Sequence, residues 1–217
     1  RLSKLDKICL ISNSDAHSPN KIGREANVLN CNLNYKDIFN AIKNQDKDKF
    51  LYTIEFFPEE GKYHFDGHRN CNISLHPKES IKLGKICPIC GKPLTIGVLH
   101  RVEELADREE VYLPIKIPYK NLVPLEEIIG QSLNKEPSSP IVQREYLKTI
   151  SNLGNELSIL MDVSLEDIIR ISGEKIAKGI NLMRQGKIKK IPGYDGVYGK
   201  IIIFPEEASS ENQLSLF

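Results

Sequence analysis

The chain has 217 residues, of which 40% are hydrophobic and 27% charged, and its formal net charge is +1. These values are ordinary for a globular protein with one large core or two small ones, and they name no function. No apolar run approaches the roughly 20 residues that cross a bilayer, and no basic start leads into an apolar stretch with a cleavage site. We therefore expect no membrane span, no secretion signal and a cytoplasmic location.

The five cysteines favour metal ligands over disulfide bonds. An odd count of cysteines in a chain without a secretion signal fits poorly with a disulfide framework. The net charge is too small to indicate a nucleic-acid partner, so only local clusters of basic residues can argue for one. Changes in sequence texture divide the chain into four expected segments, which are residues 1–61, 62–113, 114–204 and 205–217.

The first segment, residues 1–61, has the rhythm of an α/β fold. Short apolar runs predict strands at 7–11 and 51–57, and helical spacing predicts a helix at 35–42. The motif Ser-Asp-Ala-His-Ser-Pro follows the first predicted strand and contains Asp15 and His17. A carboxylate and an imidazole at the carboxyl end of a strand suit a catalytic divalent metal such as zinc, manganese or magnesium. Taken alone, the pair is a weak signal, because an Asp and a His in a loop are more often solvated or capping residues than metal ligands.

The second segment, residues 62–113, carries a predicted zinc site. His68 and Cys71 form an H-x2-C pair, and Cys87 and Cys90 form a C-x2-C pair fifteen residues later. This is zinc-finger or zinc-ribbon spacing, and four protein ligands would make the zinc structural rather than catalytic. His64 and His76 remain alternatives for the histidine ligand, and the alternative to a metal site is a set of buried cysteines.

An amphipathic helix is expected after this predicted zinc site. Its apolar residues are Val98, Leu99, Val102 and Leu105. The same predicted helix contains His100 and Arg101. Two interpretations of these residues remain open: they contact a phosphate backbone, or they face water.

The third segment, residues 114–204, begins as proline-punctuated extended chain and then becomes helical. Apolar spacing predicts a helix across 146–157, a capping box at Ser164 with Asp167, and a further helix across 176–183 that ends at Gly186. The stretch 184–200 joins cationic side chains to two tyrosines and several glycines, which are the parts of a nucleic-acid contact. Its candidate DNA-binding residues are Lys187, Lys189, Lys190, Tyr194, Tyr198 and Lys200. An ordinary helix end followed by a turn and a strand explains the same pattern.

The last segment, residues 205–217, is acidic and is expected to be disordered. It ends in the pentapeptide Gln213, Leu214, Ser215, Leu216 and Phe217. This peptide resembles the motif that bacterial replication and repair proteins use to bind the β sliding clamp. The resemblance implies clamp binding, and the alternative is a tail that folds back onto its own domain or frays without a role.

Several stretches resemble known proteins more specifically. The motif around Asp15 and His17 resembles the last metal-ligand motif of the polymerase-and-histidinol-phosphatase (PHP) superfamily. Residues 53–71, 87–108 and 192–200 resemble the corresponding stretches of endonuclease Q, so that the resemblance covers most of positions 7–204. It implies an α/β fold in which the C-terminal part of a PHP-type barrel precedes a small zinc-binding domain and a mostly helical domain.

The resemblance also implies a function. Endonuclease Q cleaves the phosphodiester bond on the 5′ side of deaminated bases (uracil, hypoxanthine, xanthine) and of abasic sites in double-stranded DNA. Asp15 and His17 match metal-ligand positions of the catalytic cluster, and Arg101 is a further candidate for DNA contact. The N-terminal H-x-H ligand pair of PHP enzymes does not occur in this chain, so we expect that preceding barrel strands are missing and that the chain alone is inactive.

Two other functions remain open at this point. The chain is a non-catalytic, zinc-stabilised DNA-binding adapter, or it is a small-molecule phosphatase of the histidinol-phosphatase type. The predicted zinc module and the basic, tyrosine-containing stretch argue against a phosphatase, because a small phosphate ester needs neither of them.

Overall fold

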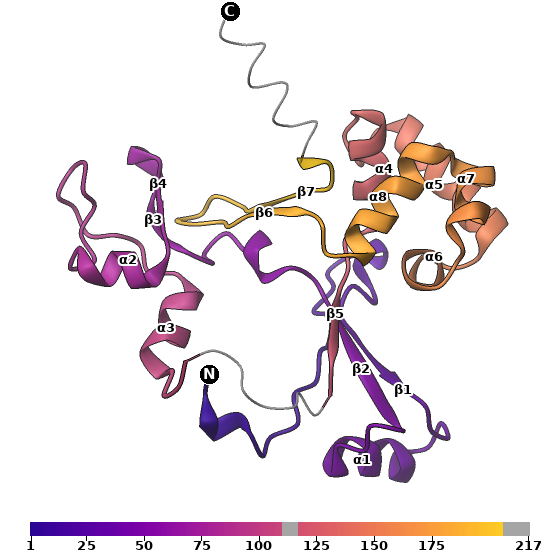
Figure 1. The fold of residues 1–217 in the computed structure, drawn as a ribbon, viewed down its shortest axis with the longest axis horizontal. Helices are drawn as coiled ribbons and strands as arrows, with labels where there is room; N and C mark the ends of the chain where they lie inside the picture. The colour runs from indigo at the N-terminus through magenta and orange to yellow at the C-terminus, as the bar shows by residue number, and fades with distance from the viewer. Residues whose placement is uncertain (110–116, 206–217) are drawn as a thin grey trace, which may run out of the picture. The chain divides into compact units, whose positions relative to one another are not determined.

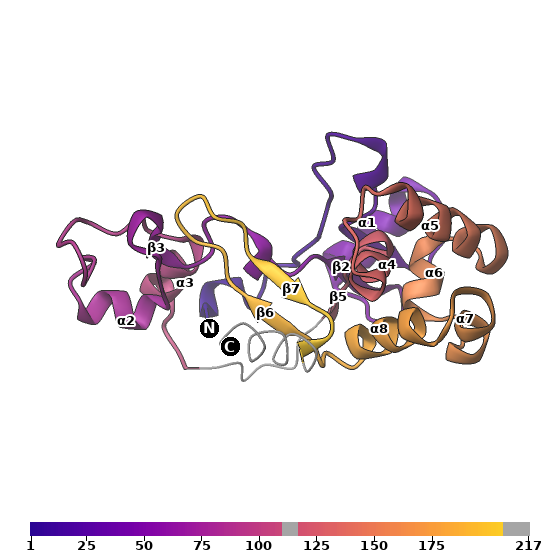
Figure 2. The same ribbon diagram turned by 90° about the horizontal axis from the view of Figure 1, so that it is seen from above.

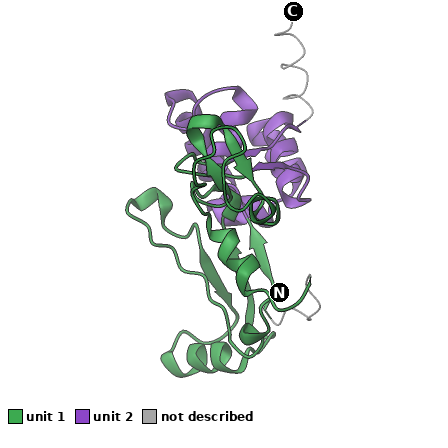
Figure 3. Cartoon of the chain, turned by 90° about the vertical axis from the view of Figure 1, so that its left-hand side faces the viewer, with its two compact units in different colours: residues 1–121, 192–199 green, residues 122–191, 200–217 purple. Residues whose placement is uncertain are grey.

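The computed structural model describes residues 1–109 and 117–205. The chain forms two compact units, which Figure 3 shows in different colours. Unit 1 contains residues 1–121 and 192–199, and unit 2 contains residues 122–191 and the chain from 200 onward. Both units combine helices with small sheets, so the mixed α/β class predicted from the sequence is confirmed. No helix in the two described ranges is long and apolar enough to cross a membrane.

The first half of unit 1 is built on a three-stranded sheet (Figure 1). Strand β1 (Ala26–Leu29) pairs antiparallel with β2 (Phe50–Glu55), and β2 pairs parallel with β5 (Tyr119–Asn121). Helix α1 (Tyr35–Asn44) connects β1 to β2. Thus the helix predicted at 35–42 and the strand predicted at 51–57 are confirmed.

The strand predicted at 7–11 is wrong, because these residues have no regular structure. Ile8, Leu10 and Ile11 remain 54%, 63% and 50% exposed. A β-strand requires a neighbouring strand, and none of the described strands pairs with this segment. The apolar pattern therefore predicted a strand but could not show which other strand would pair with it.

The second half of unit 1 is the cysteine-rich half, residues 62–109. Strands β3 (Asp66–His68) and β4 (Ile73–Leu75) form an antiparallel ribbon, which is followed by helices α2 (Pro77–Lys82) and α3 (Val98–Leu105). Helix α3 confirms the predicted amphipathic helix. Short 3-10 helices in unit 1 are Ser3–Leu5, Pro19–Lys21, Pro58–Glu60 and Arg69–Cys71.

Unit 2 is a group of five helices with a two-stranded ribbon, and Figures 1 and 2 both show the helices gathered together. The helices are α4 (Leu125–Leu133), α5 (Pro140–Leu153), α6 (Glu156–Met161), α7 (Leu165–Ser172) and α8 (Glu174–Arg184). The ribbon joins β6 (Lys189–Ile191) to β7 (Lys200–Ile202). Fully buried side chains from the helices and from the end of the ribbon form the core, among them Leu125, Ile128, Ile129, Val142, Ile159, Ile168, Ile180 and Ile203.

Two sequence signals in this unit correspond to observed helix ends, whereas the helix predicted across 146–157 is divided between α5 and α6 at Gly154 and Asn155. The Ser164 hydroxyl accepts a hydrogen bond from the Asp167 backbone N–H at 3.1 Å, so Ser164 is the N-cap of α7. Helix α8 ends at Arg184, two residues before Gly186 with φ +66°. The Arg184 guanidinium donates to the carbonyls of Ile159, Leu160 and Val163 at 2.8, 2.9 and 2.7 Å. This arginine therefore supplies hydrogen-bond donors to carbonyls at and just after the C-terminal end of α6, rather than facing solvent.

Candidate metal centre and nucleic-acid interface

The structure brings together the four residues predicted to bind zinc. His68 ends β3, and Cys71 ends the 3-10 turn that follows it. Cys87 and Cys90 lie in a knuckle closed by a hydrogen bond from the Gly91 N–H to the Cys87 carbonyl at 3.0 Å. One ligand atom from each of the four residues lies within 4.8 Å of every other. Among the described residues this is the one group of three or more such side chains placed to hold a metal ion.

The geometry of this cluster, which we call the Cys/His cluster, fits a tetrahedral ion. Sulfur at about 2.3 Å and nitrogen at about 2.0 Å from a zinc ion are about 3.5 Å apart at a tetrahedral angle. The Cys90 Sγ lies 3.4 Å from the His68 Nδ1. His64 instead stacks on Phe65, and the His76 Nδ1 accepts from the Lys78 N–H at the start of α2. The geometry therefore selects His68 among the three candidate histidines.

The thiols of the cluster influence one another's ionisation. Burial opposes a thiolate at Cys87, but hydrogen bonds from the backbone N–H groups of Cys90 and Ile89 outweigh it and lower the Cys87 pKa to about 6. Burial and the neighbouring cysteines raise the pKa of Cys71 to about 11. The Cys87 thiolate thus forms readily, and its negative charge opposes ionisation of the Cys71 thiol. A bound cation would remove this repulsion, and such a set of donors is suited to a thiophilic metal.

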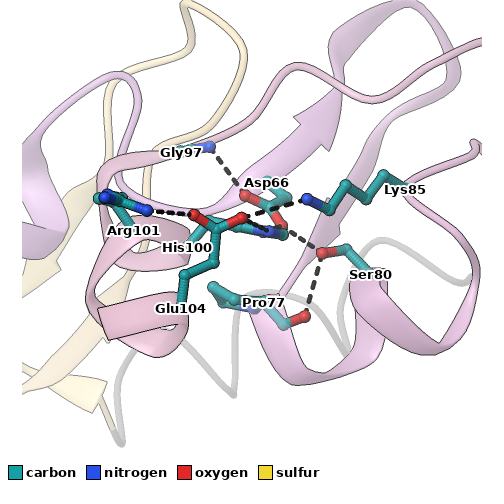
Figure 4. A network of polar contacts seen from close by, with 8 residues as sticks. All are labelled: Asp66, Pro77, Ser80, Lys85, Gly97, His100, Arg101 and Glu104. Atoms are coloured by element: carbon teal, nitrogen blue, oxygen red, sulfur yellow. Dashed lines mark hydrogen bonds and ion pairs between the residues drawn. The ribbon is translucent and has the colours of Figure 1, made fainter. Parts of the chain in front are cut away.

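A buried polar network supports the strand that carries His68 (Figure 4). At its centre is Asp66, which is 0% exposed. The Gly97 N–H donates to the Asp66 Oδ1 at 2.8 Å, and the His100 Nδ1 lies 2.5 Å from Oδ2. The Ser80 hydroxyl also donates to Oδ2. Through this carboxylate, β3 is joined to both α2 and α3.

His100 corrects one expectation from the sequence. It is 1% exposed rather than facing water, and its Nε2 lies 3.4 Å from the Glu104 Oε1. It therefore does not contact a phosphate backbone in this fold. Arg101, the next residue, is exposed and donates to Glu104 at 2.9 Å. Asp66 was missed altogether, because a single Asp at the start of a three-residue strand carries no sequence signal.

Asp15 and His17 lie in an irregular segment on the surface. Their side chains are 101% and 89% exposed, and the His17 Nε2 lies 3.6 Å from the Asp15 Oδ2. A carboxylate and an imidazole at this separation suit a divalent metal, but two ligands do not enclose one. No further metal-ligating side chain among the described residues joins them in a cluster.

The candidate DNA-binding residues fall in two different environments. Lys187, Lys189, Lys190 and Lys200 are exposed on and beside the β6–β7 ribbon of unit 2. Residues 192–199, which we call the return loop, connect these two strands but belong to unit 1. Tyr194 and Tyr198 are both in the return loop. Tyr194 is half-buried, and Tyr198 is 68% exposed.

Comparison with known proteins gives the context for these features. A sequence family described as the MJ0043 C-terminal domain matches residues 124–187, which contain helices α4 to α8. The chain is 34% identical over 214 residues to the uncharacterized protein MJ0043 of Methanocaldococcus jannaschii, covering 95% of this chain and 27% of that protein. It is 31% identical over 202 residues to the uncharacterized protein YqxK of Bacillus subtilis, covering 92% of this chain and 48% of that protein.

Two solved structures are similar over nearly the whole chain. The lesion-specific endonuclease PfuEndoQ of Pyrococcus furiosus superimposes with a TM-score of 0.83 at 30% identity, covering 98% of this chain and 54% of that one. The resemblance to endonuclease Q is therefore confirmed. A second endonuclease Q, crystallised with a 27-mer duplex carrying an abasic lesion at the active site, gives a TM-score of 0.78 at 33% identity, covering 95% and 52%. This chain thus spans about half the length of these endonuclease Q chains.

Proposed function

We propose that the chain is the C-terminal part of a metal-dependent DNA-repair endonuclease. The whole enzyme recognises deaminated bases (uracil, hypoxanthine or xanthine) and abasic sites in double-stranded DNA, and it cleaves the phosphodiester bond on the 5′ side of the lesion. The observation that carries the proposal is the TM-score of 0.83, over 98% of the chain, to a lesion-specific endonuclease. The abasic duplex bound to the second endonuclease Q supports double-stranded DNA as the partner.

In this proposal the Cys/His cluster binds one structural zinc ion. Four protein side chains complete a tetrahedral shell and leave no position for water or substrate. The ion then fixes the end of β3 against the knuckle of Cys87 and Cys90. Because a small domain of this kind has a limited apolar core, much of its folding free energy comes from the metal.

Asp15 and His17 are the catalytic candidates. We propose that they contribute two ligands to a divalent-metal cluster, and that preceding strands of a PHP-type barrel supply the others. Ions in such clusters lower the pKa of a bound water and neutralise charge that develops on the phosphate. The exposed apolar side chains of Ile8, Leu10 and Ile11 support this proposal, since a neighbouring strand would cover them.

The exposed cations are proposed to hold the DNA backbone. Lysines on the β6–β7 ribbon can neutralise phosphates without reading the sequence, as Arg101 can on α3. A base acted on inside a duplex has to be extruded, which costs a few kcal/mol and costs least at mispaired or absent bases. The residues assigned to DNA contact are Arg101, Lys187, Lys189, Lys190, Tyr194, Tyr198 and Lys200.

We expect the 217-residue chain to bind an abasic-site duplex but not to nick it. A longer chain that includes the preceding barrel strands should nick the duplex in the presence of divalent metal. Binding should weaken steeply between about 50 and 200 mM salt, because counterions are released from each neutralised phosphate. Fluorescence anisotropy and gel assays of a labelled duplex measure both properties. Metal-dependent nicking by the 217-residue chain, or binding independent of salt, contradicts the proposal, and a longer chain that binds without nicking favours the adapter.

The C-terminal pentapeptide Gln213–Phe217 lies outside the described residues, and we propose that it binds the bacterial β sliding clamp. We expect a labelled peptide of residues 206–217 to bind the clamp with roughly micromolar affinity. Burying each of Leu214, Leu216 and Phe217 contributes about 1.5–3 kcal/mol, of which ordering the peptide offsets a large part. A Leu216→Ala, Phe217→Ala peptide is the control. Equal or absent binding of both peptides refutes the assignment.

A further inference from the structure

The return loop is held on unit 1 by its own backbone. The Gly193 N–H donates to the Glu59 carbonyl at 2.8 Å, and the Phe65 N–H donates back to the Gly193 carbonyl at 2.9 Å. The Gly196 and Gly199 N–H groups donate to the carbonyls of Lys62 and Glu60 at 2.9 and 3.0 Å. A Cβ at position 193 would lie 2.4 Å from the Gly61 carbonyl oxygen, so this close approach requires glycine. The loop is therefore a fixed part of the surface.

Two side chains of the return loop reinforce this attachment. The Tyr194 ring lies over Gly67, where a Cβ would be 2.4 Å from the Tyr194 Cδ2, and its hydroxyl donates to the Asn72 side chain at 2.8 Å. The Asp195 carboxylate accepts from the Arg69 backbone N–H at 2.7 Å and from the Thr95 hydroxyl at 2.6 Å. Both residues are thus used to fix the loop.

Tyr198 differs, because the loop presents it to solvent. Its side chain is 68% exposed, and that of the nearby Tyr63 is 44% exposed. The Lys62 Nζ lies 5.6 Å from the centre of the Tyr198 ring and 5.8 Å from that of Tyr63. A Cβ built on Gly196 would be 3.5 Å from the Arg69 Nη1 and 3.7 Å from the Tyr63 hydroxyl, so the arginine lies on the same side. Lys62, Tyr63, Arg69 and Tyr198 form what we call the Tyr198 cluster.

We propose that the Tyr198 cluster binds an unstacked nucleobase and the phosphates beside it. This inference rests on the proposed function, and it assigns the Tyr198 cluster as one of the sites that contact the DNA. A rigid, exposed aromatic ring offers a flat apolar face without the entropic cost of ordering a loop. Lys62 beside that face and Arg69 beside Gly196 of the same loop can complement phosphate charge. An intact duplex offers no free base face except at its ends. A lesion site, where a base is extruded or absent, leaves neighbouring bases open to stacking.

The test compares Tyr198→Ala and Tyr198→Phe in the 217-residue chain with Tyr35→Ala as a matched control. Tyr35 is 82% exposed on α1 and lies outside the cluster. We expect Tyr198→Ala to weaken binding to an abasic-site duplex by about 5- to 100-fold, the usual range for one base-stacking contact. Binding to an undamaged duplex should change much less. Tyr198→Phe keeps the ring and should retain near wild-type affinity, while Lys62→Gln should reduce the salt slope by about one.

The outcomes separate this inference from the proposed function. If the wild-type chain binds neither duplex, the proposed function fails and the contact fails with it. If the wild type binds but Tyr198→Ala and Tyr35→Ala bind equally well, the inference is overturned while the proposed function stands, and a protein or peptide becomes the occupant to examine. An equal loss on damaged and undamaged duplex also overturns it, since it indicates a contact with the backbone alone. Melting curves and metal content unchanged from wild type show that each variant is folded.

Discussion

The purified chain is expected to retain one zinc ion through dialysis, and the double variant Cys87→Ser, Cys90→Ser is expected to lose it. Cys87 is 1% exposed, so the two substitutions remove a buried anchor and half of the ligand set. Structural zinc contributes on the order of 10–16 kcal/mol in small zinc-finger peptides at neutral pH. Loss of the ion should therefore unfold the cysteine-rich half of unit 1. Elemental analysis and circular dichroism after dialysis measure both effects.

Cys31→Ser is the matched control, because Cys31 lies outside the Cys/His cluster and should leave the zinc content unchanged. The retained zinc should also decrease as the pH is lowered. Each thiol and His68 has to be deprotonated to bind the ion, so acid competes with the metal. A fully folded wild-type protein without metal would falsify the assignment.

Asp66→Asn is expected to destabilise unit 1 by about 3–5 kcal/mol, the usual cost of removing one partner from a buried charged network. The carboxylate accepts from the Gly97 N–H, the His100 ring and the Ser80 hydroxyl. An amide can replace only part of this acceptor capacity, because its nitrogen is a donor and would face other donors. Urea unfolding followed by circular dichroism gives the difference in free energy.

Lys49→Gln provides the comparison for this measurement in the same unit. Its ammonium lies 3.6 Å from the Asp46 carboxylate on the surface, and the side chains are 54% and 33% exposed. Such a surface pair contributes at most about 1 kcal/mol. If Asp66→Asn costs no more than Lys49→Gln, then the network in Figure 4 is not what holds β3 to α2 and α3.

Local signals in the sequence predicted much of the fold. Helix α1 was predicted from its helical spacing and the start of α7 from Ser164, so both predictions used only residues close together in the sequence. The Cys/His cluster was predictable for a similar reason, since each x2 spacing places two ligands on one tight turn. The sequence alone did not decide which of His64, His68 and His76 is the fourth ligand, because that depends on where β3 ends.

Contacts between distant residues could not be predicted in this way. His100 was expected either to contact a phosphate backbone or to face water, and it is buried against Asp66, 34 positions earlier. Tyr194 and Tyr198 are alike in sequence context, yet one packs over Gly67 and the other faces solvent. The prediction of a strand at 7–11 was wrong because a strand forms only beside another strand, and sequence periodicity does not reveal whether that second strand is present.

The return loop has a consequence for the order of folding during synthesis. The chain leaves unit 1 after Asn121, forms the helices of unit 2, and supplies residues 192–199 to unit 1 only afterwards. The side-chain bond from Asp195 to the Arg69 N–H spans 126 positions. At a translation rate of about 5–20 residues per second, a ribosome needs about 6–25 seconds to cover these 126 positions. The cysteine-rich half of unit 1 thus emerges before the loop groups that bond to its Lys62 carbonyl, Phe65 N–H and Arg69 N–H, and its surface is completed last.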